Sequence, residues 1–489
     1  MDPRGEKEDD DAADESVSLL GGGKDTPSTA PPSPATNSST QEAMAIWKLA
    51  WPLAISFCFS MAQQQLNAVF VGHLGPVHLG AATLGIMWTN ISGFSIVWGG
   101  MTALDTLGSQ AYGAGMYARV GVLAQRGLAI STVMAVPVAA VWWWATGPIL
   151  ELIGIEPEIV GLAVSFTRWY ILALWPQIAC WIVNKFLSMQ NIVKPQTIVQ
   201  GVAAPFNAAL TYWMVYRTPL GFIGSPVAQA ISSWLQLLLF LIVVRCRGLH
   251  KKCWHGWTTE ALRDWKPMVM LGASGTLQTM GGWWSWELNN AMAGTMGSVP
   301  LASHACMLNM AMLTFPGLDG LGTAITIRVG NSLGAGHGAG SLRSARTGLV
   351  LVWLLLSFLL VGIWSGRDRL AYLYTADESV AALTAMTVPY YMLWSLSDTT
   401  SFIGSCVLRG AGKQPVGAAI SLASSYCAGV PAAFMLCLHT SLGIKGLWLG
   451  MGLGQGVALC LQGYYLLCRL DWQHAADEAR RRAQESTKS

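Results

Sequence analysis

The sequence predicts an all-α polytopic membrane protein with about twelve transmembrane helices in two six-helix lobes. Its 489 residues are 53% hydrophobic and 11% charged, whereas soluble domains carry about 25% charged residues. Residues 131–150 and 347–364 contain no formal charge over about the length that crosses a hydrocarbon core. A repeat of the chain at an offset of about 220 residues predicts the two lobes.

The first segment, residues 1–43, is predicted to be a disordered acidic tail. It holds ten acids and three bases and is otherwise rich in Ser, Thr, Pro and Gly, a composition that cannot bury a core. It has neither the basic nor the apolar region of a signal peptide. Glu15, Leu19 and Leu20 have the spacing of an acidic dileucine sorting signal, which suggests a trafficking adaptor as a partner.

Apolar windows between charged or Gly/Pro breaks define the spans that follow. We assign residues 44–247 to an N-lobe, 248–264 to a cytoplasmic linker, 265–470 to a C-lobe and 471–489 to a cytoplasmic C-terminal tail. The windows begin near residues 47, 79, 120, 158, 189, 224, 267, 300, 342, 379, 415 and 444.

Lys and Arg residues predict the orientation, because cytoplasmic loops carry an excess of them. The bases fall in alternate loops, and the loops between them hold few bases and several acids. The basic loops are therefore expected to be cytoplasmic, together with both termini. The bases are Arg119, Arg126, Lys185, Lys194, those of 245–252, Arg328, Arg343, Arg346, Arg409 and Lys413, and the acids are Glu151, Glu156, Glu158, Asp377 and Glu378.

Four pairs of segments recur in order and support the duplication. IWKLAWPLAIS (46–56) corresponds to DWKPMVMLGAS (264–274), and SQAYGAG (109–115) corresponds to NSLGAG (331–336). IEPEIVGLA (155–163) matches TADESVAAL (375–383), and Lys194-Pro195 matches Gln414-Pro415. Six spans per half place both halves in the same orientation, which is common in transporters whose substrate site lies between the repeats.

Two motifs that would indicate an enzyme or an ATPase are absent. There is no H-E-x-x-H and no P-loop, so neither zinc-dependent hydrolysis nor direct ATP drive is indicated. G-x-S-x-G occurs as GNSLG (330–334), in a glycine-rich segment that leads into a basic loop. The ten cysteines form no C-x-x-C pair and mostly lie in apolar runs, which predicts neither a disulfide framework nor a metal site. We expect a transporter driven by an ion gradient, without a cofactor and without nucleic acid as a partner.

Several motifs together resemble the eukaryotic branch of the multidrug and toxic compound extrusion (MATE) transporters, over roughly residues 45–475. This resemblance implies a twelve-helix, two-lobe antiporter that exports organic solutes, usually cations, in exchange for protons. The motifs are FVGHLG (70–75), GFSIVWGGMTALDTLGSQAYGAG (93–115), RVGNSLGAG (328–336), VLRGAGKQPVGA (407–418) and YCAGVPAAF…GIKGLWLGMGLG (426–454).

Two acids lie deep within predicted spans, where an ionisable group is costly and usually functional. Glu287 matches the second glutamate of the pattern E-W-W-S-x-E in the seventh span of the family, and Asp398 matches an acid of the tenth span. The resemblance assigns both to coupling between protons and substrate. A carboxyl group in a low-dielectric cavity suits this role, because it can exchange a proton for an organic cation. The alternative is structural, with Glu287 hydrogen-bonded to Asn289 or Asn290 and Asp398 satisfied by neighbouring Ser and Thr.

Helical spacing places Trp283 and Trp284 on the face of Glu287, where their rings could contact a cation, and turns Trp286 away. Asp105 is expected to pair with a base rather than lie in the ion path. Other polar residues in spans are candidates for the cavity, with His304 more often a packing residue and Asp319 a weaker candidate for coupling. The candidates are Gln63, Gln64, Gln65, Asn67, Asn90, Asn207, Asn289, His304, Asn309 and Asp319.

The chain departs from the family pattern at Gly282, which replaces the first glutamate of E-W-W-S-x-E. The preference for organic cations is therefore less certain than in the family, and export of organic anions or neutral conjugates stays open. A flippase for lipid-linked substrates is a further alternative, but it would need Lys or Arg in the cavity. We expect a monomer in the plasma membrane or in a vacuolar or endosomal membrane.

Overall fold

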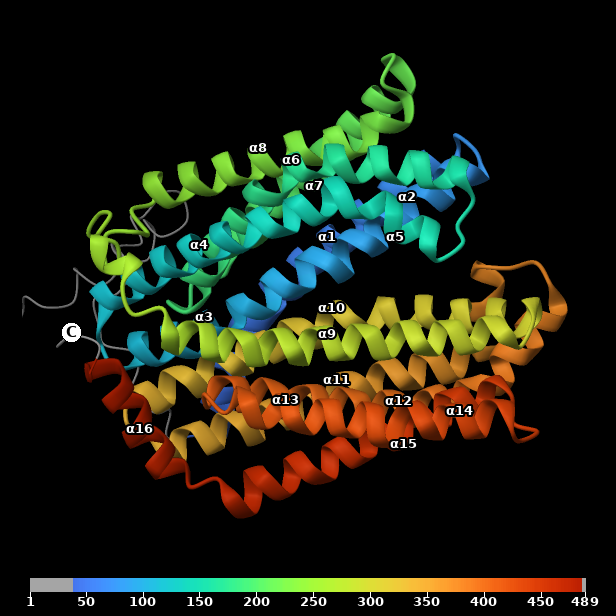
Figure 1. Ribbon diagram of the computed structural model, residues 1–489. Helices are drawn as coiled ribbons and strands as arrows, with labels where there is room; N and C mark the ends of the chain where they lie inside the picture. Colours follow the sequence, from blue (N-terminus) through green and yellow to red (C-terminus); the bar gives the residue numbers. More distant parts are fainter. Residues whose placement is uncertain (1–37, 486–489) are drawn as a thin grey trace, which may run out of the picture.

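The computed structural model describes residues 38–485, and within them the chain is helical without strands. The sorting-signal residues Glu15, Leu19 and Leu20 lie outside the described residues. Helices of membrane length begin at Ser39 and follow one another to Arg469, several of them interrupted by short π-helical or 3₁₀ segments. A last helix, α16 (Trp472–Glu485), lies across one end of the molecule (Figure 1).

The first half of the chain, the N-lobe, contains six helical spans. Two are broken by π-helical turns, so each consists of three consecutive elements. The spans are α1 (Ser39–Gly72), α2 (Pro76–Thr89) with η1 (Asn90–Phe94) and α3 (Ser95–Gly113), α4 (Tyr117–Ala140) with η2 (Val141–Ala145) and α5 (Thr146–Leu152), α6 (Pro157–Ser188), α7 (Lys194–Arg217), and η3 (Gly221–Ile223) with α8 (Gly224–Cys246).

The second half, the C-lobe, repeats this pattern after a linker that contains η4 (Thr259–Leu262). Its spans are α9 (Lys266–Thr295), α10 (Ser298–Gly334), α11 (Gly338–Leu370) with η5 (Ala371–Leu373), α12 (Glu378–Gly410), α13 (Gln414–Ala423) with η6 (Ser424–Gly429) and α14 (Val430–Leu438), and α15 (Ile444–Tyr464) with η7 (Tyr465–Arg469).

Eight of these spans are long and apolar enough by length and composition to cross a bilayer. The other four are α2–α3, α7, α9 and α12, and they fall short of that apolarity. α9 and α12 carry the two acids singled out above, and α7 carries Asn207. Polar side chains in the membrane usually face the interior of a bundle, so the more polar spans are the natural lining of a transport site.

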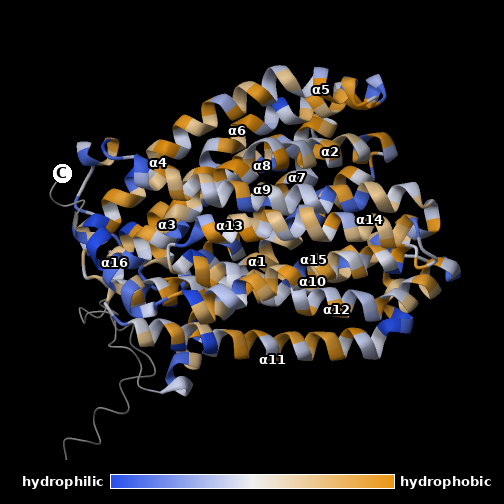
Figure 2. Cartoon of the chain, turned by 60° about the horizontal axis from the view of Figure 1, so that its bottom comes forward, coloured by the Kyte–Doolittle hydropathy of each residue, from blue (hydrophilic) through white to orange (hydrophobic). Residues whose placement is uncertain are grey.

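The two lobes converge at the end of the molecule where α16 lies, the α16 end, and diverge towards the other end (Figure 1). Between them, α1 packs on α7 of its own lobe and on α10 of the other, while α3 packs on α9 and α10. The Lys and Arg residues of the basic loops lie at the α16 end. Glu151, Glu156, Asp377 and Glu378 lie near the opposite end. Hydrophilic residues gather at the ends of the helices and along α16 (Figure 2).

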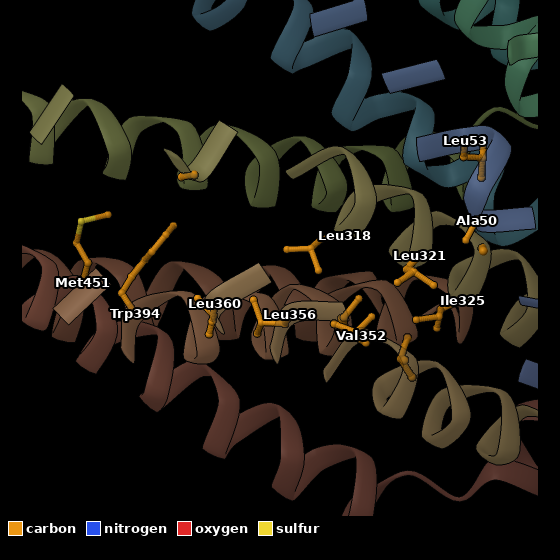
Figure 3. Close-up of a cluster of buried hydrophobic side chains, with 14 of the residues drawn as sticks. Ala50, Leu53, Leu318, Leu321, Ile325, Val352, Leu356, Leu360, Trp394 and Met451 are labelled. Carbon is orange, nitrogen blue, oxygen red and sulfur yellow. The ribbon is translucent and has the colours of Figure 1, made fainter. Parts of the chain in front are cut away.

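The largest buried cluster lies in the C-lobe and holds α10, α11, α12 and α15 together (Figure 3). It includes Leu321, Ile325, Val352 and Leu356, which are almost inaccessible to solvent. Ala50 and Leu53 of α1 belong to the same cluster, so α1 is fastened to the opposite lobe. The C-lobe can therefore hold its polar spans at fixed positions around a site.

Candidate transport site

Glu287 lies on α9 and is half-buried. Its carboxylate accepts a hydrogen bond from Asn290 Nδ2 at 3.3 Å, and Asn290 Oδ1 lies 3.0 Å from His304 Nε2 on α10. His304 is only 2% exposed. Glu287 is thus joined to a buried histidine through one amide, and Asn290 is the partner that the structural alternative named.

Asp398 lies on α12, also half-buried. Ser397 and Thr400 do not satisfy its carboxyl group, because their hydroxyls donate to the backbone oxygens of Leu393 and Leu396 at 3.2 and 2.7 Å. Within residues 38–485, no ion pair or hydrogen bond to the Asp398 carboxylate is found. A carboxyl group without a fixed partner is free to exchange a proton or a cation.

Aromatic rings connect the surroundings of the two acids. The ring of Trp448 on α15 lies 5.3 Å from the ring of His304 and 5.4 Å from that of Tyr391. A series of polar and aromatic side chains therefore runs from Glu287 to Tyr391, which lies on α12, the helix of Asp398. Sequence reasoning missed Tyr391 and Trp448, whose apolar surroundings carry no local sign of such a role.

The three tryptophans of α9 differ in their environment. Trp283 and Trp284 are 46% and 50% exposed, whereas Trp286 packs edge-on against Trp394 of α12, with ring centroids 5.5 Å apart. Helical spacing indeed directs Trp286 to a neighbouring helix. It is Trp286 and Trp394, not the two exposed tryptophans, that line a cavity of about 40 Å³ inside the C-lobe.

Gly282 lies on the wall of this cavity. A Cβ atom at this position would meet no atom within 4 Å, so the missing side chain leaves open space. The remaining walls come from α9, α12, η6 and α15, and none of them contributes an acid or a base: Ser285, Trp286, Asn289, Trp394, Ser425, Gly429, Met451, Gly454 and Gln455.

Amide side chains form a cluster in the N-lobe. Gln229 Oε1 accepts from Gln63 Nε2 at 3.0 Å, Asn207 Nδ2 at 3.3 Å and Asn67 Nδ2 at 3.4 Å. Gln200 Nε2 also donates to Gln63 Oε1 at 3.2 Å. Asn67 and Asn207 are thus brought together, whereas Gln64 is exposed and lies outside this cluster. The central acceptor, Gln229, was not among the sequence candidates.

Asp105 is paired with bases, as the sequence suggested. Both of its carboxylate oxygens lie 2.7 Å from Lys185 Nζ, and Arg409 Nη1 of the C-lobe lies 3.8 Å away. Asp319 on α10 is near enough to Arg409 and Lys185 to interact with their charges. The structure therefore groups Asp319 with this charged cluster, which bridges the lobes near the α16 end.

Both lobes of the chain match a known protein family. The model of the MatE family matches residues 52–213 and 277–435, which is most of both lobes. The chain belongs to the MatE family. The two matched segments fall one in each lobe, in agreement with the internal repeat.

Curated relatives within the family are about one third identical. Multidrug and toxin extrusion protein 1 of Oryctolagus cuniculus is 32% identical over 443 residues, covering 90% of this chain and 77% of the relative. The human protein of the same name is also 32% identical, with 90% and 77% covered. An uncharacterized transporter of Schizosaccharomyces pombe is 30% identical, with 91% and 83% covered.

Solved structures share the fold. The crystal structure of the eukaryotic MATE transporter AtDTX14 has a TM-score of 0.84 at 24% identity and covers 91% of this chain and 100% of that chain. A Vibrio cholerae MATE transporter, VcmN, has a TM-score of 0.80 at 17% identity, with 92% and 99% covered. Membership in the MatE family makes this chain a multi-pass secondary transporter that extrudes small organic solutes, and not an enzyme.

Proposed function

We propose that this MatE transporter exchanges organic solutes for protons, with Glu287 and Asp398 as the groups that carry the proton. The observation that supports this most is the half-buried Asp398 carboxyl group, which has no hydrogen-bond or ion-pair partner within residues 38–485. Glu287, held by Asn290 alone, is the second such group. Organic cations fit these acids, because the carboxylate that releases a proton can then neutralise a cation.

Exchange follows if each ligand favours one of two conformations. A ligand shifts such an equilibrium only by its differential affinity for the two states. Protonation removes the charge that holds a cation, so proton and cation compete for the same carboxyl groups. The two acids lie on neighbouring parts of one lobe, α9 and α12, and side chains of α10 and α15 lie between them.

We also propose an orientation and a cellular setting. We place the α16 end in the cytoplasm because the basic loops gather there. The transporter acts as a monomer in the plasma membrane or in a vacuolar or endosomal membrane, and Glu15, Leu19 and Leu20 form the adaptor signal.

Neutral conjugates are the second candidate substrates, and Gly282 is the observation that favours them. The lining of the C-lobe cavity contains no charged side chain, so at least part of the site is neutral. The same lining argues against a flippase for lipid-linked phosphates, since none of its residues is Lys or Arg.

The test is uptake of ethidium, a fluorescent organic cation, into proteoliposomes with an imposed pH gradient. Wild type is expected to accumulate the cation until the gradient is collapsed. Glu287→Gln and Asp398→Asn should each lower the gradient-driven rate at least tenfold, because an amide cannot carry the proton. Full coupled transport in both folded variants would rule out these two residues as the coupling groups.

A further inference from the structure

The cavity beside Gly282 has a chemistry that the two acids do not share. It has a volume of about 40 Å³, and one water needs about 10–15 Å³, so it has room for a group of about three heavy atoms. Two indole rings, those of Trp286 and Trp394, form part of its wall. Trp394 and Met451 are seen at one end of the buried cluster in Figure 3.

The cavity opens at Gly282. Six residues before it on α9, Thr276 Oγ1 still donates to the backbone of α3 at 3.0 Å, so this part of α9 is packed against the N-lobe. Gly282 itself is exposed, and the neighbouring Trp283 is 46% exposed. The mouth of the cavity therefore lies beyond the contact of α9 with α3, where a solute can reach it.

Asn289 is a lining residue of the cavity and has an unused acceptor. The residue is 2% exposed, and its Nδ2 donates to the Ser285 backbone oxygen at 2.7 Å. This bond fixes which amide atom is the oxygen, and the Oδ1 that remains has no hydrogen-bond partner within residues 38–485. An unpaired buried acceptor costs about 1–3 kcal/mol, and a ligand that donates a hydrogen bond to it would remove that cost.

The lining favours an uncharged donor over an ion. A cation would gain only the indole faces of Trp286 and Trp394 and would lose its hydration without gaining a carboxylate, since no lining residue is acidic. Asp398 lies one helical turn beyond Trp394 but does not form part of the wall. An anion would meet the acceptor Asn289 Oδ1 and no base. A hydroxyl group on a short alkyl arm satisfies the acceptor and places its methylene groups against the indoles.

We propose that this cavity is a subsite for a hydroxyl-bearing arm of the substrate, in which the hydroxyl donates to Asn289 Oδ1 and the arm passes Gly282. The inference rests on the proposed function, because it assigns one part of the solute that is exchanged for protons. The charged part of a cationic substrate stays outside the cavity, near Asp398. Gly282 then acts as a specificity determinant by keeping the entrance open.

The test compares two labelled cations that differ in one group. Choline carries a hydroxyethyl arm, and propyltrimethylammonium replaces its hydroxyl with a methyl at the same charge. Initial uptake of each is measured in proteoliposomes under a pH gradient, with thermal stabilisation of the solubilised full chain as a binding readout. Wild type should prefer choline at least tenfold, since a site that bonds a hydroxyl rejects the analogue without it.

Two variants remove the preference by different routes. Asn289→Leu removes the acceptor, and Gly282→Gln fills the open entrance; each should bring the ratio of the two rates to within about twofold of one. Gly282→Ala, which adds only a methyl group in open space, should keep the preference. Asn309→Leu is the matched control. The sequence offered Asn309 for the cavity, but it does not belong to the lining, and its Nδ2 donates to the Ala305 oxygen at 2.9 Å, as that of Asn289 does to Ser285.

The outcomes separate this inference from the proposed function. A wild-type ratio near one, a tenfold preference that persists in Asn289→Leu, or no binding of either compound overturns the hydroxyl subsite. If Asn289→Leu does not fold, the Gly282→Gln result decides. Ethidium uptake in the same vesicles reports proton coupling independently, so gradient-driven ethidium transport without a hydroxyl preference defeats the subsite alone. Loss of all gradient-driven transport, with choline binding intact, defeats the coupling alone.

Discussion

At Asp105, a carboxylate of the N-lobe meets a lysine of its own lobe and an arginine of the other. Lys185 and Asp105 are only 12% and 8% exposed in their side chains, so water screens the pair little. Next to them, Thr106 Oγ1 accepts from Gln414 Nε2 at 2.8 Å, and Gln110 Nε2 donates to the Gly410 oxygen at 3.1 Å. Asp105 is thus the centre of a polar contact between the lobes.

Removal of this charge should destabilise the protein. Asp105→Asn removes the carboxylate that pairs with Lys185 and Arg409 and leaves Asp319 as the remaining acid of the cluster. Breaking a largely buried pair from one side costs about 3 kcal/mol. The apparent melting temperature of the solubilised protein should fall clearly. Asp377→Asn is the control, because Asp377 is an exposed N-cap of α12 and asparagine caps helices equally well. Equal melting temperatures for the two variants would contradict a stabilising role of Asp105.

The sequence alone predicts these individual residues unevenly. Glu287, Asp398 and Gly282 follow from a motif and from the cost of charge in a membrane. The partners His304 and Trp448 come from separate spans, and which faces of two spans meet depends on helix rotation, which no local pattern encodes. Trp286 illustrates this: spacing on α9 turned it away from Glu287, but only the packing against α12 makes it a cavity wall.

At the scale of elements, α16 lies entirely within the segment that the sequence predicts to be the C-terminal tail. It carries no apolar run of membrane length. Its buried residues are all alanines: Ala475, Ala476, Ala479 and Ala483. Small side chains bury little area and give a weak signal, yet they let α16 pack closely on α10 and α11. Arg119 of the N-lobe donates to the Ala483 oxygen at 2.9 Å, so α16 contacts both lobes.

An ion pair makes the docking of α16 sensitive to pH. Partial burial by itself raises the pKa of Glu478, but the hydrogen bond from Lys413 and the charges of Arg482 and Lys413 outweigh it and hold the pKa below its usual value. A lowered pKa in the folded state stabilises the protein above the pKa of the unfolded chain, about 4.3, and this stabilisation is lost as the pH falls through the folded value.

Hydrogen exchange of α16 measures this effect. After correction for intrinsic rates, protection of the helix should be constant near neutral pH and fall below about pH 4. Glu478→Gln should reduce protection at pH 7 and abolish most of the pH dependence. The exposed Asp477 provides the matched control, Asp477→Asn. Identical protection profiles for wild type and Glu478→Gln would show that the pair does not hold α16.

At the scale of the whole molecule, the internal repeat predicts two lobes with the same orientation, and family comparison and structure agree with this. The repeat does not predict where the lobes touch, because contact between them depends on backbone approach rather than on either half alone. The lobes meet near the α16 end, where glycines let the two backbones approach closely. Gly113 lies against the backbone of Asn331, and Gly334 lies against that of Gln110. Alternating access requires these contacts to open.

A side chain at Gly334 should hold this end open. The Cβ of Gly334→Ala would overlap the Gln110 carbonyl oxygen, and because that atom belongs to the backbone of α3, the lobes must move apart. Cysteines introduced at the exposed positions Ala118 and His337 carry spin labels, in a background without the exposed native cysteines. Double electron–electron resonance between the two labels measures the distance between the lobes. The variant should shift the distribution of distances between the labels to longer values and slow gradient-driven transport at least tenfold, because the closed state is lost.

Gly456→Ala is the control, because a Cβ at this position meets nothing within 4 Å. It should match wild type in both measurements. An unchanged distribution in a folded Gly334→Ala protein would mean that helix adjustment absorbs the methyl group and that this close approach does not control closure.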